Sequence, residues 1–165
     1  MNDRLERYLN DHLAGSQSAI AVLKDLAKRQ DKPEEARFFR QLREAVEEDQ
    51  KLLASLLERA GMKVSNVQKA AGKLTAQAGR LKLKWEGMES GELGTFEALE
   101  MLALGIQGKR ILWIMLTEIA PHFPEWSGMD FPSLERRARE QRDAVEKRRI
   151  AAGREALATP ALQAD

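Results

Sequence analysis

The segment from residue 93 to residue 117 is the most apolar part of this chain, and it restricts the fold more than any other feature. Placed on a helix, its large apolar side chains form two stripes: Leu99, Leu102, Ile106 and Trp113 on one, and Met101, Leu104, Ile111 and Met115 on the other. A helix that is apolar on most sides belongs in a protein core. Charged and amide side chains interrupt the segment, so that no run of about 18 apolar residues could span a membrane. We therefore expect a buried helix that other helices surround.

The composition of the 165 residues favours a single all-α domain. Charged residues make up 32% of the chain and aromatic residues only 5%, a balance typical of helices rather than sheets. We expect the domain to cover residues 1–158 and to be followed by a flexible tail at 159–165. The net charge of +1 provides no overall attraction to nucleic acid or to an anionic membrane.

Cysteine is absent from the chain, which excludes disulfide bonds, a thiol nucleophile and thiolate metal ligands. The first ten residues lack the apolar core of a signal peptide. The expected location is therefore the cytoplasm.

Apolar residues at spacings of three and four predict three more long helices. The first covers residues 3–29, and the second begins at Pro33 and ends before Gly61, a residue suited to a left-handed helix end. The last begins after Asp130, which can cap its first turn, and it tolerates Pro132 there. The expected inward faces of these three helices are Leu5, Leu9, His12, Ser16, Ala19, Leu23 and Leu26; Phe38, Leu42, Ala45, Asp49, Leu52 and Leu56; and Leu134, Ala138, Gln141, Val145, Arg148 and Ala152.

The connections between the helices predict how the bundle is arranged. Residues 120–128 carry two prolines and two aromatic side chains, and we expect them to plug one end of the bundle. Residues 65–85 place apolar side chains on one narrow face and basic side chains elsewhere, which predicts an amphipathic crossover helix. Such a long connection can carry the chain back along the bundle, so that the second and third bundle helices run in the same direction. We therefore expect a ferritin-like four-helix bundle with an additional crossover helix between the second and third bundle helices.

Each of the four bundle helices places a polar side chain at a similar height, counted from the helix ends. The resulting layer comprises His12, Asp49, Glu100, Gln107, Arg110 and Gln141. An unpaired buried carboxylate costs several kcal/mol, and we therefore expect Arg110 or His12 to neutralise Asp49. Two interpretations of the layer stay open: a hydrogen-bonded network that sets the register of the helices, and a residual metal or small-ligand site.

This architecture resembles the ferritin-like superfamily over nearly the whole chain. The stretches Val46-Glu-Glu-Asp-Gln and Ala78-Gly-Arg-Leu-Lys-Leu are also similar to those of an uncharacterised bacterial family of small four-helix-bundle proteins. Di-metal members of the superfamily use a Glu-x-x-His motif from each of two helices. Here the matching positions hold Asp49 with Leu52 and Gln141 with Ala144, and neither Leu52 nor Ala144 can bind a metal. We therefore expect no metal, no cofactor and no catalytic residue.

Two hypotheses for the function remain. The first, which we prefer, is a non-catalytic interaction or scaffold protein that binds an unknown protein partner or forms a homodimer through the flanks of its apolar helices. The second is a ferritin-like metal-binding protein or oxidoreductase whose atypical site would be built from His12, Asp49, Glu100 and their neighbours.

Overall fold

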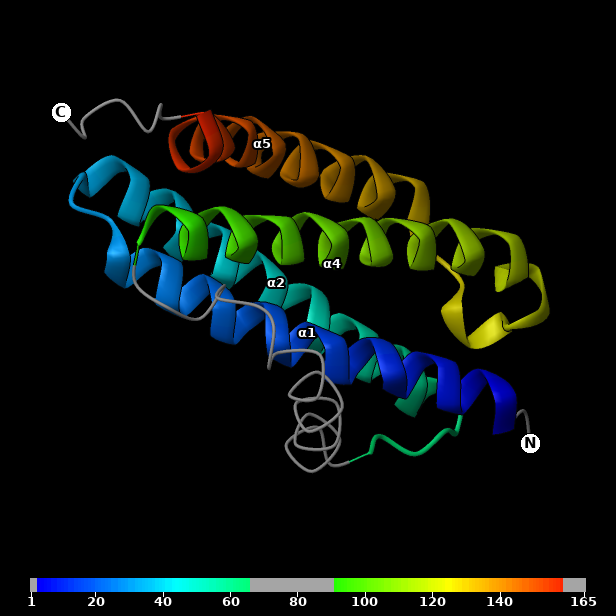
Figure 1. Ribbon diagram of the computed structural model, residues 1–165. Coiled ribbons are helices and arrows are strands. Elements are labelled where there is room, and N and C mark those ends of the chain that lie inside the picture. Colours follow the sequence, from blue (N-terminus) through cyan, green and yellow to red (C-terminus); the bar gives the residue numbers. More distant parts are fainter. Residues whose placement is uncertain (1–2, 66–90, 159–165) are drawn as a thin grey trace, which may run out of the picture.

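The computed structural model describes residues 3–65 and 91–158, which form four long helices and two short 3-10 turns. Helices α1 (Asp3–Arg29) and α2 (Pro33–Arg59) form one antiparallel hairpin, and α4 (Glu92–Ile119) and α5 (Phe131–Ala158) form the other (Figure 1). These two ranges contain no strand, and the expected all-α class is confirmed for them. The crossover helix expected at residues 65–85 and the tail expected at 159–165 lie outside the described residues, except for Ser65, and the single-domain assignment stays a prediction.

The two hairpins pack against each other to form one bundle. Helix α4 packs against α1 as well as against α5. Helix α5 also reaches α2: the guanidinium group of Arg148 donates to both carboxylate oxygens of Glu35, at 2.7 and 3.0 Å, and lies 3.4 Å from the centre of the Phe38 ring. Figure 1 shows that α2 and α4 run in the same direction, as the crossover connection predicted.

The start of the long connection is fastened to the first turns of α1. The backbone N–H of Lys63 donates to Glu6 Oε2 at 3.0 Å, and that of Ser65 donates to Asn10 Oδ1 at 2.8 Å. Asn10 is buried, and its Nδ2 donates in turn to the backbone oxygen of Lys63 at 2.9 Å. These bonds turn the chain back along α1 directly after α2, a role of Asn10 that the apolar pattern of α1 did not reveal.

The helix ends agree with the residues that predicted them. Gly61 follows Ala60, the residue that caps the end of α2, and has a φ of 69°, a left-handed conformation that glycine adopts without steric cost. At the start of α5 the backbone N–H of Ser133 donates to Asp130 Oδ1 at 2.9 Å, and Pro132 lies in the first turn. Asp130 therefore caps α5 as expected.

The loop after α4 closes one end of the bundle, as its prolines and aromatic side chains predicted. It consists of two 3-10 turns, Ala120–His122 and Pro124–Trp126. The Trp126 ring is buried between Phe123 and Phe131, with ring centres at 4.2 and 6.0 Å, and its Nε1 donates to the backbone oxygen of Leu56 at 2.9 Å.

The apolar core consists of two clusters at opposite ends of the bundle. The expected face of α2 is confirmed at Leu42, Asp49 and Leu56, which are buried. At its other three positions the neighbouring residue is buried instead: Phe39, Val46 and Leu53 are buried, whereas Phe38, Ala45 and Leu52 are half-buried. The difference arises because α2 contacts both α1 and α5 and needs a broader apolar face than a single stripe. The expected burial of Asp49 is confirmed.

Candidate functional site: a buried ion network beside a cavity

A polar layer separates the two core clusters. On α2 it lies between Val46 of one cluster and Leu53 of the other, and on α4 between Ile106 and Leu112. On α5 the flanking residues are Ala138 and Val145, one from each cluster. All three helices therefore change from apolar to polar and back at the same height.

Asp49 is the centre of this layer, and only 4% of the residue is exposed. Lys109 Nζ on α4 donates to Asp49 Oδ2 at 2.6 Å and to Gln141 Oε1 on α5 at 2.5 Å. Arg137, also on α5, donates to Asp49 Oδ1. The Asp49 network, defined as Asp49, Lys109, Arg137 and Gln141, thus joins three of the four helices.

The Asp49 network holds two cations against one anion. Burial lowers the pKa of the Lys109 ammonium group, while the Asp49 carboxylate opposes this shift and Arg137 adds to it. Because both oxygens of Asp49 are already bonded to cations, the carboxylate is held in one position. A slip of α4 along α2 would separate these charges inside the core, so the network helps to define the register of the helices.

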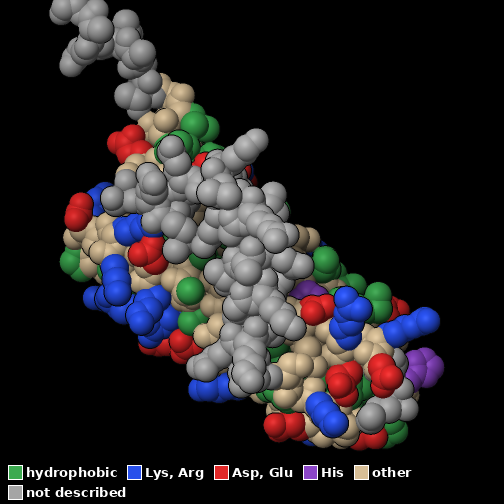
Figure 2. Space-filling model, turned by 60° about the horizontal axis from the view of Figure 1, so that its bottom comes forward, with side chains coloured by type: hydrophobic (Ala, Val, Ile, Leu, Met, Phe, Trp, Pro, Cys, Tyr) green, Lys and Arg blue, Asp and Glu red, His purple; other side chains and the backbone are tan. Residues whose placement is uncertain are grey.

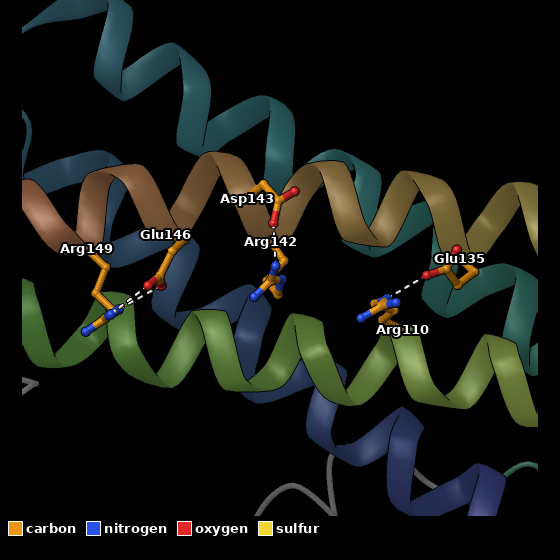
Figure 3. Close-up of polar contacts among 6 residues, drawn as sticks. All are labelled: Arg110, Glu135, Arg142, Asp143, Glu146 and Arg149. Carbon is orange, nitrogen blue, oxygen red and sulfur yellow. Dashed lines mark hydrogen bonds and ion pairs between the residues drawn. The ribbon is translucent and has the colours of Figure 1, made fainter.

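The expected pairing of Asp49 with Arg110 or His12 is wrong. Arg110 Nε instead donates to Glu135 Oε1 on α5 at 2.5 Å, and Figure 3 shows its side chain directed toward Glu135. Successive residues of a helix point about 100° apart, so Lys109 can face α2 while Arg110 faces α5. The sequence did indicate that Lys109 faces the core, because it follows Ile106 by three residues and precedes Trp113 by four, on the buried stripe of α4.

The remaining residues of the predicted layer lie apart from the Asp49 network, except for Gln141, which belongs to it. Glu100 accepts from Arg149 of α5 at 3.2 Å. Gln107 is half-buried, and its Oε1 has no hydrogen-bond donor among the described residues. His12 packs edge-to-face on Tyr8, with ring centres 4.8 Å apart. The structure therefore does not assemble the six predicted residues into one site.

The residues present do not fit the di-metal site of a ferritin-like protein. The only carboxylate in the Asp49 network already bonds two cations, and the ammonium group of Lys109 would repel a metal ion at that position. Within residues 3–65 and 91–158, no three histidine, aspartate or glutamate side chains gather closely enough to hold a metal ion.

A cavity of about 380 Å³ lies beside the Asp49 network, between α1, α2 and α4. Its walls are mostly apolar, and three glycines, Gly15, Gly105 and Gly108, leave space in them. His12 and Ser16, from the predicted inward face of α1, line the α1 side of the cavity. They border the cavity and are not members of the Asp49 network. This volume is within the range of small-molecule binding sites.

His12 should make the stability of the fold depend on pH. Burial lowers the pKa of His12 below its ordinary value of 6.5, and the nearby Asp11 carboxylate opposes this shift. Between the lowered pKa and 6.5 the unfolded chain binds more protons than the folded chain, and the free energy of unfolding therefore falls as the pH falls through this window. We expect the urea midpoint of His12→Gln to fall less than that of the wild type between about pH 7 and about pH 5.5.

The exposed histidine of the loop provides the control for this prediction. His122→Gln should retain the full pH dependence of the wild-type midpoint, because His122 is exposed in the turn after α4. An unchanged pH dependence in His12→Gln would contradict the assignment of this effect to His12.

The surface of the described residues mixes both signs of charge. Figure 2 shows Lys and Arg side chains next to Asp and Glu side chains over the described part of the face that it draws. No helix within residues 3–65 and 91–158 is both long and apolar enough to cross a membrane. Comparisons of the chain with protein-family models, with curated proteins and with solved structures found no match.

Proposed function

We propose that this chain is a non-catalytic, ferritin-like helical bundle that acts by binding a helical segment of a partner protein on the outer face of α4. The observation that carries the proposal is a stripe of exposed apolar side chains on that face. Leu104, Ile111 and Met115 are 69%, 51% and 47% exposed. With Gly108 they form the α4 stripe, whose spacings of four, three and four residues match the apolar seam by which one helix packs on another.

The stripe contains the three most exposed large apolar side chains of α4, whereas the apolar residues on the opposite side of the helix are used in the core. Leu102, Ile106 and Leu116 are almost fully buried. A soluble protein gains no stability from large apolar side chains kept in water, and contiguous exposed apolar surface is typical of interaction sites. The glycine in the stripe would allow the backbone of a second helix to approach closely.

The charges around the α4 stripe favour one kind of partner. The charged residues of α4 on this side are Glu97, Glu100 and Glu118, all acidic, although Glu100 already accepts from Arg149 of α5. The two basic residues of α4, Lys109 and Arg110, are instead bonded to α2 and α5. The best complement is therefore an amphipathic helix whose apolar seam is bordered by lysine or arginine. A second copy of the same face would bring acidic side chains against acidic ones, and a homodimer through this stripe is less favourable.

The proposed non-catalytic role rests on the state of the buried polar side chains. Both oxygens of Asp49 are bonded to cations, and Lys109 is bonded in turn to Asp49 and Gln141. A general acid or base must exchange protons with a substrate, which these bonds oppose. They support a structural role for the Asp49 network.

The test uses the whole chain and a designed helical peptide of about three heptads with leucine at the seam positions and lysine beside them. Fluorescence anisotropy of the labelled peptide measures binding. The double substitution Leu104→Ser and Ile111→Ser should weaken binding at least about tenfold. The matched control is Ile150→Ser with Leu157→Ser, which removes two equally large apolar side chains that are 43% and 65% exposed on α5.

Two further measurements complete the test. A peptide with glutamate in place of the flanking lysines should bind more weakly than the lysine peptide, because the α4 stripe is bordered by acidic residues. Light scattering after gel filtration measures the oligomeric state of the wild type. Equal binding by the α4 and α5 double variants would overturn the proposal, and so would a wild-type dimer that the α4 substitutions dissociate, since the stripe would then bind a second copy.

A further inference from the structure

The cavity between α1, α2 and α4 is open to solvent between α1 and α4. Of the residues that line it, Asp11, Gly15 and Gly105 are exposed, whereas Ile106 and Leu112 are buried and belong to its floor. Figure 1 shows that α1 and α4 move apart toward the N-terminus of α1. The cavity is therefore a cleft, and a binding partner can contact the residues at its rim.

The cleft is continuous with the α4 stripe. Gly108 belongs to both, because it lines the cleft and lies in the stripe between Leu104 and Ile111. Gly105, the neighbour of Leu104, is exposed at the rim of the cleft. A helix that packs along the α4 stripe therefore passes over the mouth of the cleft.

The rim of the cleft leaves room for a side chain that enters from outside. A methyl group built onto Gly15, Gly105 or Gly108 would meet no other atom within 4 Å. Gly15 lies on α1 and the other two glycines lie on α4, so both walls are open. The volume of about 380 Å³ accommodates one large side chain. Between packed helices, such holes receive a side chain of the neighbouring helix.

The α1 wall of the cleft favours an aromatic side chain. Tyr8 and His12 are both half-buried at this wall, and their rings contact each other edge-to-face with centres 4.8 Å apart. Aromatic rings pack favourably on other rings in edge-to-face and offset arrangements, beyond the gain from burying their area. An aromatic side chain in the cleft would therefore gain ring contacts that an aliphatic one lacks.

The charge at the α1 rim favours a basic residue beside that aromatic side chain. The exposed carboxylate of Asp11 has no ion-pair partner within residues 3–65 and 91–158. The Asp49 network beside the cleft has one more cation than anions, so the favourable position for a lysine is the α1 rim rather than the α4 side. A lysine three or four residues from the aromatic residue would lie on the same side of a bound helix.

We propose that this cleft is the anchor pocket of the docking surface. The partner helix on the α4 stripe inserts one aromatic side chain between Gly15 of α1 and Gly105 of α4, and it places a lysine or arginine beside Asp11. This inference rests on the proposed function. It adds α1 as a second wall of the binding site, and it makes the aromatic anchor the feature by which the site selects its partner.

The experiment uses two versions of the designed peptide, with tryptophan or alanine at one central seam position and lysine four residues later. Fluorescence anisotropy with the whole chain should show that the tryptophan peptide binds at least about tenfold more tightly than the alanine peptide. Gly15→Leu should reduce this ratio to less than about threefold, because leucine takes the space of the anchor. Ala151→Leu, which adds the same side chain at an exposed position of α5, is the matched control and should keep the ratio.

Two more variants test the walls of the cleft. Gly105→Leu closes the cleft from the α4 side and should act like Gly15→Leu, so the test does not depend on the folding of one variant. Replacing the lysine of the tryptophan peptide with glutamine should weaken binding to the wild type by about threefold or more, and by less in Asp11→Asn. A thermal melt of each variant verifies that it is folded.

The outcomes separate this inference from the proposed function. An unchanged ratio in folded Gly15→Leu and Gly105→Leu would overturn the anchor pocket, while the proposed function would stand if Leu104→Ser with Ile111→Ser still weakened binding. Unchanged binding in all of these variants would overturn both.

Other occupants of the cleft would also be recognised. A wild-type dimer that Gly15→Leu dissociates would assign the cleft to a second copy and overturn the proposal. Tighter binding of the tryptophan peptide to Leu74→Ser with Leu81→Ser would assign it to the chain's own residues 65–85, with the same consequence.

Discussion

Replacing Asp49 with leucine should lower the free energy of unfolding by about 3–5 kcal/mol. The substitution leaves the ammonium group of Lys109, whose side chain is 13% exposed, with only the neutral oxygen of Gln141 as a partner. Arg137 has a side chain that is 43% exposed and can turn toward water, so most of the loss comes from Lys109. Urea denaturation followed by circular dichroism at neutral pH measures the change.

A double variant separates the ion network from the shape of the core. Asp49→Leu combined with Lys109→Leu should recover most of the stability, because a buried ion pair replaced by apolar side chains is often neutral. Asp143→Ala is the control: Asp143 pairs with Arg142 on the exposed part of α5 (Figure 3), and its loss should cost less than about 0.5 kcal/mol. A double variant as unstable as Asp49→Leu would show that the pairing with Lys109 is incorrect.

The second large effect concerns the aromatic plug at the end of the bundle. Trp126→Ala should lower the free energy of unfolding by about 3–5 kcal/mol, because it leaves a cavity and removes the contacts with Phe123 and Phe131. The burial of Trp126 is almost complete, since only 2% of the residue is exposed. The same denaturation experiment measures this loss.

The variant Trp126→Phe distinguishes packing from hydrogen bonding at this position. It keeps an aromatic ring and loses the bond from Nε1 to the oxygen of Leu56. That oxygen also accepts from the backbone N–H of Ala60 at 3.2 Å, so it keeps a partner and the loss should be only about 1–2 kcal/mol. Equal losses for Trp126→Ala and Trp126→Phe would mean that the ring does not hold this end of the bundle closed.

The helices themselves were largely predictable from local patterns. The first helix was expected at residues 3–29 and is found there, and the apolar helix expected at 93–117 extends to Glu92–Ile119. Proline at a helix start, glycine after a helix end and an aspartate cap act through neighbouring residues alone, which is why Pro33, Gly61 and Asp130 marked the boundaries correctly.

The candidate site was only partly predictable. The spacing of apolar residues on α2 places Asp49 inside the bundle, and its burial makes a cationic partner necessary. The choice of that partner depends on how α4 and α5 are rotated about their axes, and a rotation of one residue moves a side chain by about 100°. Arg110 was therefore expected to pair with Asp49. In the structure Lys109 and Arg137 pair with Asp49, and Arg110 pairs with Glu135.

The sequence by itself determined an all-helical chain, the ends of its helices, the direction of α2 relative to α4 and a charge that had to be neutralised in the core, because these properties follow from spacing, caps and connection length. Tertiary structure alone decided which cation meets Asp49, where the core leaves a cavity and which apolar side of α4 stays exposed. Helix α4 is apolar on nearly every side, so its own pattern contains no preferred inward face, and only the packing of α1 and α5 selects one.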